Sequence, residues 1–235
     1  MTELAAAAIA FFLLHRGVAG TRLRDVIVQG IGTKAFRVLF ALATLLVLIW
    51  LWLAFDDARA GAGNARLYPT LAGLKPVQLV LQFLAILLIV TGVTTRNPTI
   101  VGGGASVRDQ NVVRGVLRIT RHPFMWGTSL LALGHMLVAP TVANCIFFGV
   151  LLLVASTGTL SIDAKRRRAL AADWGPFAEK TSNLPFGAIF AGRQTLRLGE
   201  IGLWRLLVVV VVYAALLLLH PTLFGAQAVL LHPFA

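Results

Sequence analysis

The chain has 235 residues, of which 58% are hydrophobic and only 13% are charged. Soluble domains average about 45–50% apolar and about 25% charged residues, so this composition argues against a soluble protein and favours an integral membrane protein. The formal net charge of +12 would suit nucleic acid, but the basic residues lie in the loops between apolar stretches, where membrane lipids with anionic headgroups are better partners. We therefore predict no nucleic-acid partner.

Six apolar stretches follow one another along the chain, and each is a candidate transmembrane helix. A spanning helix needs roughly 20 residues, with a range of about 17–25. The second, third and fifth stretches reach this length, whereas the other three need residues from their flanks. The stretches are Leu4–Leu14, Val38–Phe55, Val77–Thr94, Phe124–Ala139, Val142–Ile162 and Leu206–Leu219. We predict an all-α fold, a polytopic membrane helix bundle of about six transmembrane helices.

The positions of Lys and Arg predict the orientation of this bundle. Most of the 21 basic residues lie in every second connection, which are the first, third and fifth. The positive-inside rule places those connections in the cytoplasm and both chain termini outside it. We predict an integral protein of the bacterial inner (cytoplasmic) membrane.

The chain shows no convincing second domain, so residues 1–235 are predicted to form a single membrane domain. The longest polar stretch, residues 163–198, is predicted to be a cytoplasmic loop with a short helix from Asp163 to about Trp174, followed by a Gly175-Pro176 break. The apolar tail, Thr222–Ala235, is interrupted by Gly and Pro and is predicted to lie at the interface or on the bundle. The single cysteine, Cys145, excludes an internal disulfide.

A basic loop meets the fourth apolar stretch at Arg121-His122-Pro123-Phe124. Pro123 suits a first helical turn because it has no N–H to leave unpaired, which puts His122 at the N-cap, facing the positive end of the helix dipole. Positive potential disfavours imidazolium, and a neutral imidazole is the form that binds a metal or accepts a proton. The predicted topology brings His15 to a similar depth. The pair could ligate a metal or haem, or could be two interfacial histidines bonded to carbonyls or water.

The other histidines are predicted to lie elsewhere. His135 is 13 residues beyond His122, about 20 Å deeper and on a different helix face. It could be a mid-membrane polar contact or a ligand in a rearranged site. His220 and His232 are predicted to be interfacial.

Side chains near His122 could line a cofactor or polyene pocket. Trp126 follows at i+4 and Ser129 at i+7, on the same helix face, although ordinary helix packing explains them equally well. Arg114, Arg118 and Arg121 have helical spacing and could pair with the propionates of a haem, or could anchor the chain at the membrane surface.

Several hydrolase classes lack support in the sequence. There is no HExxH or GxSxG motif and no pair of intramembrane carboxylates, and Glu200 is expected to be the only acid near the interior of a span.

The run from Gly115 to His135, GVLRITRHPFMWGTSLLALGH, resembles the NnrU family, which includes the plant and cyanobacterial 15-cis-zeta-carotene isomerases. The similarity continues through the segment that starts at Asp163, through Trp174-Gly-Pro-Phe, and through residues 181–194. The resemblance implies a membrane protein that binds haem b through histidines. It also implies haem-supported cis–trans isomerisation of a carotene, so an apolar polyene or another lipid-soluble small molecule would be the substrate.

By motif match, the resemblance implies His122 as a catalytic residue and iron ligand, with His15 as the second. His135 is an alternative ligand, grouped with Arg114, Arg118, Arg121 and Trp126 as cofactor-binding residues. Another branch of the family is associated with denitrification and nitric oxide metabolism. In this chain, Ala139–Asn144 stands where the family often has an Asn-Gly-Asp turn, so the sequence does not assign the chain to one branch of the family.

Two other functions are compatible with parts of this pattern. Membrane methyltransferases that use S-adenosylmethionine also place Arg-His-Pro at a helix start, but they typically carry paired glutamates where this chain has Lys165-Arg166-Arg167. A non-enzymatic haem sensor or an assembly factor linked to denitrification needs only the haem.

Overall fold

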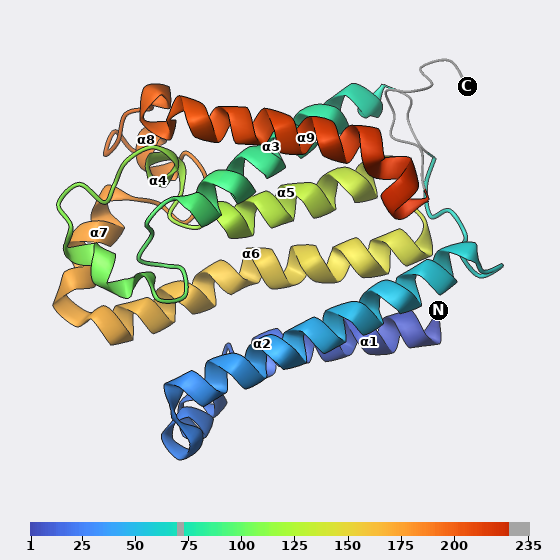
Figure 1. The fold of residues 1–235 in the computed structure, drawn as a ribbon, viewed down its shortest axis with the longest axis horizontal. Helices are drawn as coiled ribbons and strands as arrows, with labels where there is room; N and C mark the ends of the chain where they lie inside the picture. The colour runs from blue at the N-terminus through green and yellow to red at the C-terminus, as the bar shows by residue number, and fades with distance from the viewer. Residues whose placement is uncertain (70–72, 226–235) are drawn as a thin grey trace.

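The computed structural model describes residues 1–69 and 73–225. In these ranges regular secondary structure is helical, apart from an isolated bridge between Arg66 and Thr141. The long helices run side by side, and the short helices gather at one end of the bundle (Figure 1). The predicted all-α fold is confirmed.

Within residues 1–69 and 73–225, six longer helices form the body of the protein, and the first of them continues as a π-helix, η1. Their bounds are α1 (Thr2–Phe12), η1 (Leu13–Val18), α2 (Leu23–Ala60), α3 (Leu74–Thr94), α5 (Pro123–Val138), α6 (Val142–Leu170) and α9 (Leu203–Phe224). The short elements are η2 (Gly103–Arg108), α4 (Val116–Ile119), η3 (Ala171–Asp173), α7 (Trp174–Lys180), α8 (Gly187–Phe190) and η4 (Leu198–Ile201).

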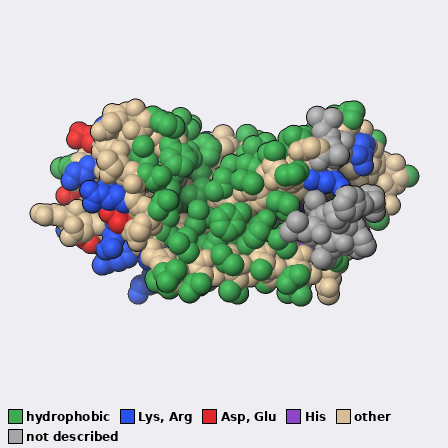
Figure 2. Space-filling view, turned by 90° about the horizontal axis from the view of Figure 1, so that it is seen from above, with side chains coloured by type: hydrophobic (Ala, Val, Ile, Leu, Met, Phe, Trp, Pro, Cys, Tyr) green, Lys and Arg blue, Asp and Glu red, His purple; other side chains and the backbone are tan. Residues whose placement is uncertain are grey.

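Four helical segments in the described ranges are long and apolar enough to cross a membrane, namely Leu23–Ala60, Leu74–Thr94, Val142–Lys180 and Leu203–Phe224. Helix α5 is apolar but shorter. On the face shown in Figure 2, hydrophobic side chains cover the middle of the molecule, Lys and Arg side chains lie toward both ends, and acidic side chains are visible at one end. The chain is therefore a polytopic membrane protein, while the count of six spans and the orientation of the termini stay predictions.

Small residues let the central helices approach closely. A Cβ on Gly127 of α5 would lie 2.8 Å from the carbonyl oxygen of Ala85 on α3, and a Cβ on Gly92 of α3 would lie 2.7 Å from the backbone nitrogen of Phe124. Close approach through small residues is a general way to pack helices in membranes. Helix α9 packs on the other side of α3 through Val209, and α1 packs on α2 and α6.

The structure differs from the sequence prediction at two helix ends. Helix α6 does not stop at Ile162 but continues through Asp163 to Leu170, because the residues that follow Asp163 are good helix formers. Gly175 and Pro176 lie in the first turn of α7 and do not break it, since proline is tolerated there.

The sixth span is also longer than predicted. Helix α9 passes through Pro221 and ends at Phe224, so the first residues of the apolar tail are helical. The remainder of the tail from residue 226, with His232, lies outside the described residues.

Candidate functional site

His122 is the buried histidine at the start of α5. It occupies the N-cap, with Pro123 in the first turn, as the sequence predicted, and its residue is only 2% exposed. The loop after α3 fixes the backbone before it, because the carbonyl of Arg121 accepts hydrogen bonds from Asn97 Nδ2 at 3.0 Å and Thr99 Oγ1 at 2.9 Å. The position of the ring is therefore set by the loop after α3 as well as by α5.

Asp163 on α6 binds the His122 side chain and two others. Its Oδ1 lies 2.7 Å from Nε2 of His122. Arg121 donates from Nε and from its terminal nitrogen, at 2.9 Å to Oδ1 and 2.5 Å to Oδ2, and Asn183 Nδ2 donates to Oδ2 at 3.0 Å. A buried carboxylate needs such pairing to offset its loss of hydration. We call Arg121, His122, Asp163 and Asn183 the Asp163 cluster.

The bond to Asp163 decides which nitrogen of His122 can accept a ligand. A carboxylate accepts hydrogen bonds, so Nε2 carries the proton and a neutral ring keeps its lone pair on Nδ1. Within the described chain, Nδ1 is buried and has no hydrogen-bond partner. A carboxylate behind an imidazole is the arrangement that orients metal-ligating histidines. His122 is therefore suited to bind a metal or accept a proton through Nδ1.

His15 lies in the π-helical segment η1. Its Nδ1 lies 2.9 Å from the carbonyl oxygen of Phe11, four residues earlier, which leaves the lone pair of a neutral ring on Nε2. The ring packs on Phe11 with centroids 4.3 Å apart, and on the edge of Phe40 at 5.6 Å. π-Helical turns are rare and are frequent at functional sites.

His15 and His122 both lie beside the C-terminal half of α6. Arg16 donates to the carbonyl of Thr157, Ser161 donates to the carbonyl of Gly20, and His122 contacts Asp163. These contacts agree with the predicted similar depth. No ring contact or hydrogen bond joins the two imidazoles in the described chain, and no group of three or more His, Cys, Asp or Glu there could hold a metal ion.

His135 lies farther along α5 and forms a separate aromatic group. Its Nδ1 lies 2.8 Å from the carbonyl oxygen of Leu131, and its ring stacks on Phe148 at 4.3 Å. The ring of His220 on α9 lies 6.4 Å away and nearly parallel. The structure thus brings His135 together with His220 and not with His122.

The three arginines near His122 have different environments. Arg118 donates to both oxygens of Glu200, at 2.7 and 3.0 Å. This pairing, helped by the N–H of Gly115, lowers the pKa of Glu200 to about 2. Arg121 belongs to the Asp163 cluster, whereas the side chain of Arg114 is exposed and has no partner in the described chain.

Trp126 lies directly beside the Asp163 cluster. Its Nε1 donates to the carbonyl of Asn183 at 2.8 Å. The same carbonyl accepts a hydrogen bond from Thr120 Oγ1 at 2.6 Å. Trp126 therefore helps to fix Asn183, which in turn donates to Asp163.

The sequence reasoning missed Asp163 and Asn183. It named Glu200 as the acid near the interior of a span and did not single out Asp163, which lies inside α6. A signal was present, since Asp163 is a single acid between an apolar run and the basic residues 165–168. Nothing adjacent to Asn183 marked it, because its role depends on a contact with α6.

Comparison with known proteins identifies the family of this chain. Residues 3–228 match the family described as NnrU protein. The chain belongs to the NnrU family. Its NnrU relatives include a chloroplastic protein of Arabidopsis thaliana named 15-cis-zeta-carotene isomerase, which is 30% identical over 187 residues. That alignment covers 79% of this chain and 50% of the relative, so this NnrU chain spans about half the length of the relative it matches. No solved structure matches the chain.

Proposed function

We propose that this NnrU protein is an integral-membrane haem protein that isomerises a cis double bond in a carotene-like polyene. The observation that carries the proposal is the buried Nδ1 of His122, which has no partner in the described chain while Asp163 holds the opposite nitrogen. The isomerase relative supports the reaction class. The charge distribution supports a place in the cytoplasmic membrane with this site near its inner surface.

The histidines that would hold the haem are His122 and His15. Each ring is oriented by a hydrogen bond at one nitrogen, from Asp163 and from the Phe11 carbonyl respectively. Each neutral ring therefore offers one lone pair, and imidazole is a ligand that suits iron. His135, the alternative ligand that the sequence suggested, lies beside Phe148 and His220 and not beside His122, so we place the second ligand at His15.

The three arginines near His122 differ in whether they are available to pair with the propionate groups of a haem. Arg118 and Arg121 are already bound to Glu200 and Asp163, so Arg114 is the one of the three that is available within the described chain. When bound, the haem would supply the redox chemistry that transiently lowers the order of the double bond.

The protein side of the reaction is binding and orientation. Isomerisation changes neither the atoms nor the net number of electrons of the substrate, so it requires no proton donor and no hydrolytic nucleophile. An apolar polyene needs apolar surroundings between helices that exclude water. The Asp163 cluster would hold the His122 ring in one orientation while the substrate turns about its double bond.

The first experiment measures the absorption spectrum of the detergent-purified full chain, oxidised and reduced, together with its haem content. We expect a Soret band typical of two imidazole ligands, lost or shifted in His122→Ala and His15→Ala. His232→Ala is the matched control, because this residue lies beyond the residues that match the family, and its spectrum should equal that of the wild type. An unchanged spectrum in both test variants would overturn the ligand assignment.

The second experiment follows the conversion of 15-cis-zeta-carotene in membranes that contain the protein, with the isomers separated by chromatography. We expect the trans product with wild type and not with His122→Ala. Bound haem without conversion would instead favour a sensor or assembly factor. Absence of haem together with saturable S-adenosylmethionine binding would favour a methyltransferase.

A further inference from the structure

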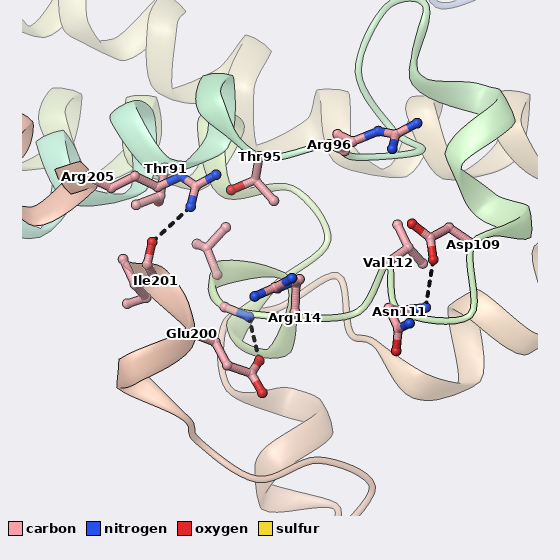
Figure 3. A pocket seen from close by; sticks show the side chains of 12 residues that line it. Thr91, Thr95, Arg96, Asp109, Asn111, Val112, Arg114, Glu200, Ile201 and Arg205 are labelled. Carbon is pink, nitrogen blue, oxygen red and sulfur yellow. Dashed lines mark hydrogen bonds between the residues drawn. The ribbon is translucent and has the colours of Figure 1, made fainter. Parts of the chain in front are cut away.

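A cleft of about 330 Å³ lies where the end of α3, the loop before α4 and the start of α9 meet (Figure 3). Three arginines from these three segments line it, namely Arg96, Arg114 and Arg205. Two acidic residues, Asp109 and Glu200, also line it. Of these residues, only Arg114 is also named in the proposed haem site.

The wall of the cleft is fixed by Gly115. The N–H of Gly115 donates to Oε2 of Glu200 at 2.9 Å, as the dashed line in Figure 3 shows. Gly115 has a φ of +56°, and a Cβ there would lie 3.0 Å from the carbonyl oxygen of Glu200. Only glycine therefore fits this position without strain.

The two acids are already engaged. Arg118 binds both oxygens of Glu200, so its charge is balanced inside the wall. Asp109 accepts a hydrogen bond from the backbone N–H of Asn111 at 2.9 Å and stabilises its own loop. Neither carboxylate neutralises the arginines of the cleft by an ion pair.

Arg205 is also engaged, but Arg96 and Arg114 are available. Arg205 donates to the carbonyl and the hydroxyl of Thr94, both at 3.1 Å, and to the carbonyl of Ile201 at 3.0 Å, which ties α9 to the end of α3. The side chains of Arg96 and Arg114 are exposed and make no hydrogen bond or ion pair within residues 1–69 and 73–225. Guanidinium groups in this state suit a phosphate group, which can accept several hydrogen bonds.

The cleft lies at the level where two spanning helices end. Helix α3 ends at Thr94 and α9 begins at Leu203. Apolar side chains beside the cleft are exposed, with Val93 at 59%, Leu203 at 73% and Trp204 at 52%. Tryptophan is enriched at the membrane interface. A ligand with a phosphate in the cleft would therefore have acyl chains against these residues.

We infer that this cleft binds the phosphate-bearing headgroup of an anionic phospholipid from the inner leaflet. Arg96 and Arg114 contact the phosphate, and the first turn of α9 contacts the acyl chains. This site shares Arg114 with the proposed haem site, whereas Arg96 and the first turn of α9 belong to the cleft alone.

The test measures the affinity of the detergent-purified full chain for phosphatidylglycerol, for instance by native mass spectrometry. We expect Arg96→Gln/Arg114→Gln to weaken binding about tenfold. The control Arg167→Gln/Arg168→Gln removes the same charge from two exposed residues of α6 outside the cleft. It should change the affinity less than about twofold.

Other outcomes would overturn the inference. Equal losses of affinity in the two double variants would show that the lipid is attracted by the overall charge of the protein and does not bind at a specific site. Inorganic phosphate that binds as tightly as phosphatidylglycerol would show that the ligand is not a lipid. Without lipid, both double variants should melt like the wild type, because none of the four side chains has a partner within the described chain.

Discussion

The segments around His122 and His15 place an imidazole beside the same stretch of α6, but they hold it in different ways. His122 is 2% exposed and binds a carboxylate that Arg121 and Asn183 also hold. His15 is partly exposed, and its ring binds a carbonyl in its own helix. Three chain segments thus orient one ring, whereas a local turn and two phenylalanines orient the other.

This difference assigns different roles to the two histidines in the proposed site. A ring held by distant segments cannot turn without disturbing several buried hydrogen bonds, which is costly in a low-dielectric interior. A ring held by one local carbonyl can move with a change of its own turn. We expect His122 to be the fixed ligand and His15 the exchangeable one.

Rescue by free imidazole should separate the two roles most strongly. In His15→Ala, imidazole should enter the partly exposed site and restore the wild-type spectrum. In His122→Ala it should not, because the site is closed and the Asp163 cluster loses its ring. Titration of both variants with imidazole, followed by absorption, measures this. Equal rescue of both would remove the distinction between them.

Asp163→Ala should cause the largest loss of stability. It leaves Arg121, whose side chain is only 13% exposed, without its carboxylate, and removal of one partner of a buried pair costs about 3–5 kcal/mol. Thermal unfolding in detergent measures the effect. Asp173→Ala is the control, because Asp173 pairs with the exposed Arg108 and exposed pairs contribute little. Equal melting of the two variants would show that the Asp163 cluster does not stabilise the fold.

Replacing a glycine by alanine should affect stability differently in the region around His122 and in the region around His15. A Cβ on Gly92 would meet the backbone of Phe124 at 2.7 Å, next to His122, so Gly92→Ala should destabilise by about 1–3 kcal/mol through overpacking. At Gly17, near His15, no atom outside the neighbouring residues and the backbone of the same helix lies within 4 Å of the place that an added methyl group would take, so Gly17→Ala should be neutral or slightly stabilising. The same unfolding assay compares them, and a reversed order would contradict the packing described for α3 and α5.

Lowering the pH should reduce the contribution of Glu200 to the stability of the fold by a small amount. The pKa of Glu200 is lowered from 4.5 to about 2 by Arg118 and the Gly115 N–H. Its contribution to stability is therefore complete above pH 4.5 and is lost as the pH falls from there toward 2. Glu200→Gln should be less stable than wild type at about pH 6, and the gap should narrow at about pH 3. A gap that stays constant would show that the carboxylate charge does not contribute.

Local rules predicted the features that depend on neighbouring residues. The N-cap position of His122 follows from Pro123, because capping involves only adjacent backbone groups. The apolar runs located the long helices for the same reason. The end of α6 was placed too early because hydropathy marks where a membrane span ends, and a helix can continue in water when its residues favour it.

Features that depend on distant segments were not accessible from the sequence. Asp163, Asn183 and His122 meet only because α5, α6 and the loop after α7 converge. The pairing of Arg118 with Glu200 likewise requires the loop before α9 to fold back on α4. Spacing along one helix could show that the arginines share a face, but not which of them was already bound.

The π-helical turn at His15 also has a consequence for sequence change. In η1 the N–H of Ala19 bonds to the carbonyl of Leu14, five residues earlier, so this turn holds one residue more than a regular helical turn would. Deletion of a single residue there would restore regular winding and would leave the two flanks in nearly the same relative orientation. A one-residue deletion, which in a regular helix turns one flank by about 100°, should therefore preserve the packing of α1 when it falls in this turn.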